Sequence, residues 1–105
     1  MKLSRQKKSL ITTAIKEQRK LSFTYDGQYR IVEPYTLGIS SQDNYNLSAY
    51  QTEGSSKSNE VPAWKLFSTH KIQNLRVTDE SFDKIRSDYM RGDARMEKIL
   101  VEVTY

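Results

Sequence analysis

The first hydrophobic residues of the chain recur with the spacing of one helical face. At positions i, i+1, i+4 and i+5 lie Leu10, Ile11, Ala14 and Ile15. Most of the surrounding lysines and arginines fall off this face. Ser4 belongs to the residue types that cap helix starts. The pattern predicts an amphipathic helix from about Ser4 to about Gln18.

From Leu21 the period of the pattern changes to two, which is typical of strands. Residues 21–25 alternate between hydrophobic and polar, and the Asp26-Gly27 pair that follows indicates a two-residue hairpin turn. Alternation resumes over 28–33. We expect Pro34 to end this strand or to mark a sheet edge, because proline cannot donate to a ladder.

Further strands are predicted over residues 35–40, 45–51 and 63–69, with a short extended piece over 75–78. A turn at 41–44 joins the first two. The low-complexity stretch 52–59, TEGSSKSN, is predicted to be a flexible loop rather than a domain linker, because strand signals resume after Pro62. Residues 70–74 are predicted to form a tight turn or a short helical turn.

The C-terminal quarter predicts a second helix and a last strand. Asp79 and Glu80 suit a helix start, since acidic residues favour the positive end of the helix dipole. Gly92 ends this predicted helix, whose buried face carries Phe82, Ile85 and Tyr89. Residues 98–105, KILVEVTY, alternate as a strand. This strand either pairs within the domain, pairs with a second copy of the chain, or begins a deleted next domain.

These elements predict a mainly β fold with flanking helices. An N-terminal helix precedes about five short strands, and a C-terminal helix and strand follow. Short strands, tight turns and one flanking helix are typical of a small, partly open β-barrel. The length of 105 residues fits a single domain, 1–105, with its core in 10–82 and the C-terminal helix and strand in 83–105.

The composition excludes several classes of protein. The chain has no cysteine, which rules out disulfides, thiolate zinc sites and cysteine nucleophiles. No apolar run reaches the roughly 18 residues of a membrane span, and we find no signal peptide, so we expect a cytoplasmic protein with no membrane partner. A glycine-rich phosphate loop, an HExxH motif and a supported Ser-His-acid set are all missing. We therefore expect a non-enzyme without a cofactor or a metal.

Charge is unevenly distributed along the chain. Residues 1–25 hold seven basic residues and one acidic residue, and residues 63–78 hold three basic residues and no acidic one. Residues 26–62, between them, hold two basic and five acidic residues. If the two basic segments meet in space, they form a patch for phosphates. The alternative is a solvated helix face and an ordinary strand.

Several segments together resemble one known family. They are ITTAIKEQRKLSFTY at 11–25, R-x-V-E-P at 30–34, YNLSAY at 45–50, FSTHKI at 67–72 and VTDESF at 77–82. Over residues 11–82 the chain resembles a WYL domain, which is named for a Trp-Tyr-Leu tripeptide. Here that tripeptide is Tyr45-Asn46-Leu47. Lys65 and Lys71 stand where the family usually has arginine, so charge is kept at these two positions but bidentate phosphate geometry is lost. His70 stands where the family usually has aspartate.

The resemblance implies a small Sm-like β-barrel that acts as a ligand-sensing or effector module. WYL domains occur in bacterial transcription regulators and in defence systems, including phage defence, and they often dimerise. The ligands associated with the family are nucleotides and nucleic acids. The resemblance therefore predicts a non-catalytic regulatory module that binds a nucleotide or a short single strand of DNA or RNA and forms a homodimer. The segment KILVEVTY resembles the start of the family's C-terminal extension.

Six residues are candidates for the binding site: Arg30, Tyr50, Trp64, Lys65, His70 and Lys71. Arg30 either clamps a phosphate or a base edge with its planar fork, or makes a cross-strand ion pair with Glu33 or Glu60. The two aromatic candidates either stack on bases or belong to the core. The lysines contact an anion or are simply solvated, and the histidine touches the ligand or serves as a turn residue.

A second hypothesis is a protein-interaction or dimerisation module without a small ligand. Its motivation is the strand predicted at 98–105, since an unpaired strand edge invites pairing with another chain.

Overall fold

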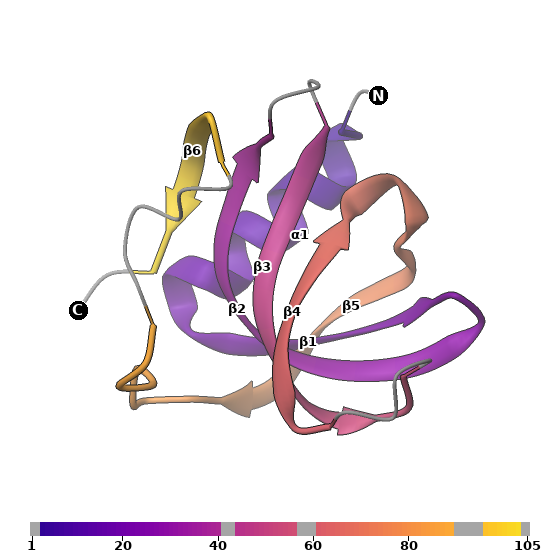
Figure 1. The fold of residues 1–105 in the computed structure, drawn as a ribbon, viewed down its shortest axis with the longest axis vertical. Helices are drawn as coiled ribbons and strands as arrows, with labels where there is room; N and C mark the ends of the chain where they lie inside the picture. The colour runs from indigo at the N-terminus through magenta and orange to yellow at the C-terminus, as the bar shows by residue number, and fades with distance from the viewer. Residues whose placement is uncertain (1–2, 41–43, 57–60, 90–95, 104–105) are drawn as a thin grey trace.

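Six strands form one antiparallel sheet that does not close into a complete barrel (Figure 1). The computed structural model describes residues 3–40, 44–56, 61–89 and 96–103. In chain order the elements are α1 (Arg5–Glu17), β1 (Arg19–Tyr25), β2 (Gln28–Ile39), β3 (Tyr45–Gly54), β4 (Ala63–Ser68), the 3-10 turn η1 (Thr69–Lys71), β5 (Gln73–Ser81) and β6 (Lys98–Glu102). The sheet order is β4-β3-β2-β1-β5, and β6 pairs with β2. The predicted mainly β, partly open architecture is confirmed.

Helix α1 forms where the hydrophobic period predicts it. The Ser4 side chain caps it by accepting a hydrogen bond from the Lys7 N–H at 3.1 Å. Gln18 ends it in the left-handed conformation, with φ 52°. The helix contacts β1, β2 and β5, on the far side of the sheet in Figure 1, through its buried residues Ile11, Ala14 and Ile15.

The β1–β2 hairpin turns at Asp26 and Gly27, as predicted. Their φ values of 54° and 73° are both positive, as a type I′ turn requires. This turn sets the hairpin register, in which Tyr25 faces Gln28 and Phe23 faces Arg30.

Strand β2 runs through Pro34 without a break, so the prediction that Pro34 separates two strands is wrong. On one side of β2, strand β1 pairs as far as Val32, and strand β6 pairs from Thr36 onward. The partner strand therefore changes near Pro34. The register with β3 also shifts between Pro34 and Thr36. Val32 and Leu37 are an odd number of residues apart, yet both are fully buried. The shift allows this, because a regular strand would place them on opposite faces.

The predicted helix from Asp79 is also wrong. Strand β5 continues to Ser81, which pairs with Arg19 of β1, and residues 82–89 are irregular. Glu80 makes an ion pair with Lys20 at 3.1 Å across the strands instead of facing a helix dipole. The three expected hydrophobic positions still pack on the core: Phe82, Ile85 and Tyr89. The predicted helix end at Gly92 lies outside the described residues, as do 41–43 and 57–60.

Strand β6 pairs with β2 inside the domain, which is the first of the three alternatives for the C-terminal strand. The Val103 N–H donates to the Tyr35 carbonyl at 2.8 Å, and Val103 is fully buried. The strand is therefore part of this domain's own core.

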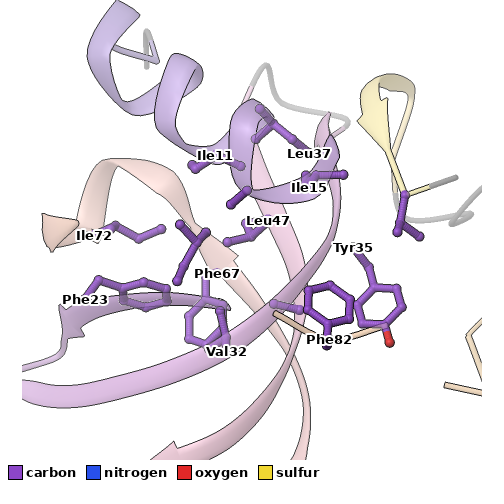
Figure 2. Packing of buried hydrophobic residues seen from close by; sticks show 14 residues of the cluster. Ile11, Ile15, Phe23, Val32, Tyr35, Leu37, Leu47, Phe67, Ile72 and Phe82 are labelled. Atoms are coloured by element: carbon purple, nitrogen blue, oxygen red, sulfur yellow. The ribbon is translucent and has the colours of Figure 1, made fainter. Parts of the chain in front are cut away.

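The core lies between α1 and the inner face of the sheet (Figure 2). We define the inner face as the one that carries Leu47 and Phe67, which pair across β3 and β4. Phe67 meets Phe23 edge to face at a centroid distance of 5.0 Å. A second group lies to one side of the core, where Tyr35 and Phe82 pack at 5.5 Å.

We expect Val103→Ala to lower the free energy of unfolding by about 2 kcal/mol, because it removes two buried methyl groups and leaves a cavity. Urea unfolding measures the change. Lys98→Ala, at an exposed position of the same strand, is the control and is expected to leave the midpoint unchanged. Equal midpoints for Val103→Ala and wild type would contradict the placement of β6 in the core.

Candidate functional site

The six residues predicted to bind a ligand do not lie on one surface. Ala49 and Gln51 are two residues apart on β3, so both point to the inner face. Arg30 contacts Gln51, and Lys65 pairs with Ala49. Both candidates therefore lie on the inner face. Trp64 precedes Lys65 in β4 and so points to the opposite, outer face, together with its cross-strand partner Tyr50. Two further candidates lie in η1, beyond the end of β4: His70 and Lys71.

Arg30 is a buried cation, with 4% of its surface exposed. Its guanidinium carbon lies 5.2 Å from the ring centre of Tyr25 and 5.7 Å from that of Phe67. It donates to three oxygens, all uncharged: Gln51 Oε1 at 3.4 Å, the Tyr25 carbonyl at 3.2 Å and Gln28 Oε1 at 3.4 Å. Its Nε is buried without a hydrogen-bond partner.

The described residues offer Arg30 no carboxylate partner. Glu33, one of its two predicted partners, makes its ion pair with Arg86, and the other, Glu60, lies outside the described residues. A buried charge without a counter-charge is unfavourable, even where neutral hydrogen bonds partly compensate. Among the described residues, the guanidinium of Arg30 therefore meets only neutral acceptors.

Lys65 approaches the same end of the inner face. Gln51 is fully buried and donates through Nε2 to the Ser55 carbonyl at 3.0 Å, while Lys65 Nζ donates to Ser56 Oγ at 3.2 Å. Two cations are thus connected to the segment 55–56. Lys65 donates to Ser56 directly, whereas Arg30 donates to Gln51, which in turn donates to Ser55. We call Arg30, Gln51, Ser56 and Lys65 the anion site, because they are the candidate position for a bound anion.

On the outer face, Tyr50 and Trp64 already have partners within the chain. Their rings meet edge to face at 5.3 Å, and the Arg86 guanidinium lies over Tyr50, with its carbon 3.7 Å from the ring centre. Trp64 Nε1 donates to Asp88 Oδ2 at 2.8 Å. The sequence predictions missed Arg86, which contacts the sheet across 53 positions of the chain. No local pattern marks such a contact.

Arg86 and Glu33 form a bidentate pair, with Nε–Oε1 and Nη2–Oε2 distances of 2.8 and 3.1 Å. The hydrogen bonding of Arg86 to the Glu33 carboxylate, which accepts from the guanidinium, raises the pKa of Arg86 above its ordinary value. Burial raises the pKa of Tyr35, whose hydroxyl accepts the Arg86 backbone N–H at 3.0 Å. At neutral pH Arg86 is thus charged and Tyr35 is neutral.

The two basic segments of the chain meet at η1. Lys7 Nζ, from the first turns of α1, donates to the Thr69 carbonyl at 2.9 Å. This contact places the basic start of α1 beside His70 and Lys71, which are both exposed. The two basic segments therefore do come together in space, at a place separate from the anion site.

Other kinds of site find little support in the described part of the chain. Within it, no three potential metal ligands among His, Cys, Asp and Glu gather in one place. None of its helices has the length and hydrophobicity needed to span a bilayer.

The family model of the WYL domain matches residues 6–77. The chain belongs to the WYL domain family. This confirms the resemblance seen in the sequence and is consistent with a regulatory sensing module, because WYL domains are generally regulatory rather than catalytic. The match includes the anion site and ends before Arg86. Neither a curated protein nor a solved structure matches the chain.

We expect Gln28→Glu to stabilise the free domain by about 1 kcal/mol, because it gives buried Arg30 a charged acceptor in place of a neutral one. Chemical unfolding measures the gain. The matched control is Gln73→Glu, the same change at an exposed position of β5, which is expected to have a smaller effect. If Gln28→Glu destabilises the domain, the charge of Arg30 is already compensated.

Proposed function

We propose that this WYL domain is a non-catalytic regulatory module that binds a nucleotide or a short single-stranded nucleic acid, with a phosphate at the anion site. The observation that carries the proposal is Arg30, a nearly buried guanidinium whose described acceptors are all neutral. Family membership supports a sensing role.

A phosphate suits this arrangement in both charge and shape. The guanidinium fork of Arg30 can donate two parallel hydrogen bonds to one phosphate, and Lys65 adds a point charge. Binding would supply a counter-charge that none of the described residues gives Arg30, and this compensation contributes to affinity. Gln51 holds one side of the fork and is itself fixed by the Ser55 carbonyl, so the site is partly preorganised.

The other candidate residues would contact different parts of a longer ligand. Tyr50 and Trp64 lie on the outer face, so the proposal does not place them against the same phosphate. His70 and Lys71, beside Lys7, offer a second basic surface that a single strand could follow. A mononucleotide at the anion site would leave that surface empty.

We also propose that the module works in bacterial transcription regulation or phage defence, as a homodimer whose geometry shifts on binding. A role as a pairing module without a ligand has weaker support, because β6, its motivating strand, is paired with β2. Sedimentation velocity of the whole chain, with and without an oligonucleotide, measures the oligomeric state. Deleting β6 is not a suitable test, because the deletion also removes buried Val103.

We expect the wild type to bind a labelled short single strand at about 0.15 M salt, and Arg30→Ala to bind about tenfold or more weakly, because a charged hydrogen bond is lost. Fluorescence anisotropy measures both. The control is Arg76→Ala, which removes the same charge from an exposed position of β5. Affinity should also fall with rising salt, as phosphate contacts require.

Equal affinities for wild type and Arg30→Ala would overturn the assignment of the anion site. Lys71→Ala separates the two ligand classes. It should weaken binding of a strand that extends to η1 and leave the binding of a mononucleotide unchanged.

A further inference from the structure

The segment 82–89 is irregular, yet it is held closely against the outer face of the sheet. Arg86 pairs with Glu33, and Asp88 accepts a hydrogen bond from Trp64. The Tyr89 hydroxyl contacts Thr36 and Glu102. The hydrogen bonds that tie residues 83–88 to the sheet each involve a side chain, including the one from the Arg86 N–H to the Tyr35 hydroxyl.

The surface under Arg86 is built by the sheet alone. Glu33 of β2 faces Tyr50 of β3, which faces Trp64 of β4, so the three residues form one cross-strand row. A carboxylate that accepts two hydrogen bonds, next to an aromatic face, is what a guanidinium needs. Because the row belongs to three paired strands, it does not depend on Arg86 for its geometry.

The two partners of this ion pair differ in burial. The Glu33 side chain is 7% exposed, whereas that of Arg86 is 36% exposed. A pocket of about 280 Å³ lies beside the pair, lined by Glu33 and by residues 82–86. The acceptor is thus deep and fixed, while the side chain that fills it comes from a partly exposed, incompletely packed segment.

We propose that Glu33, Tyr50 and Trp64 form a guanidinium-binding site that Arg86 fills reversibly, and that an arginine side chain of a partner protein takes its place when residues 83–88 lift away, while Phe82 and Tyr89 stay packed on the core. A vacant site would leave Glu33 as a buried, unpaired carboxylate, which is strongly unfavourable. The site therefore exchanges one guanidinium for another rather than standing empty. Arginine and aromatic side chains are also the groups that most often dominate protein interfaces.

The first experiment is a chemical rescue of Arg86→Ala. N-acetylarginine amide serves as the probe for a partner's arginine, and N-acetyllysine amide, of equal charge, is the control. Trp64, the only tryptophan, reports on the site through its emission, and the thermal midpoint reports on stability. We expect the arginine probe alone to raise the midpoint and to restore the wild-type emission. Neither probe should act on the double variant Glu33→Gln/Arg86→Ala.

Equal rescue by both probes, or none, would overturn the proposal. If Arg86→Ala does not fold, Arg86→Lys takes its place, since lysine keeps the charge but lacks the fork. Neither the thermal midpoint nor the Trp64 emission depends on an oligonucleotide. A negative result here is therefore distinct from a negative result for nucleic-acid binding at the anion site.

The second experiment needs no variant. The Arg86 amide donates to the Tyr35 hydroxyl, so its hydrogen exchange in the wild type reports whether the segment opens locally. We expect it to exchange faster than the paired amides of β2 and β3, without global unfolding. Exchange of the Arg86 amide only through global unfolding would show that the segment is a fixed part of the fold and would overturn the proposal.

Discussion

The alternation of side chains along β2 is the constraint on which both candidate sites depend. Arg30 and Glu33 are three residues apart, so one points to the inner face and the other to the outer face. Their neighbours on β3 separate in the same way, with Gln51 beside Arg30 and Tyr50 beside Glu33. One pair of strands thus carries a buried cation on one side and a buried anion on the other.

The two buried charges are compensated differently. Glu33 accepts a bidentate pair of hydrogen bonds from Arg86, which lies in the segment between β5 and β6. Arg30 meets only neutral oxygens and aromatic rings among the described residues. Removing one partner of a buried ion pair is strongly destabilising, so Glu33 depends on Arg86 or on another cation. Arg30 and Glu33 are therefore the two charges on which the proposals for this WYL domain rest.

Predictions from the sequence succeeded where structure is local and failed where strands compete for partners. The hairpin at Asp26 followed from two residues that accept positive φ, and α1 followed from its period and its cap. Pro34 was expected to break a strand, but the change of partner from β1 to β6 accommodates it. Glu80 was expected at a helix start, but the cross-strand pair with Lys20 keeps it in β5.

The sequence by itself determined the family, the helix and most strands, because period, turn chemistry and motif spacing act over a few neighbouring residues. Only the tertiary structure decided which candidates share a surface. It placed Lys65 on the same face as Arg30, and it brought Arg86 onto Tyr50 from a segment without regular structure. Faces are assigned by strand register and by contacts across tens of residues, and no local pattern encodes either of these.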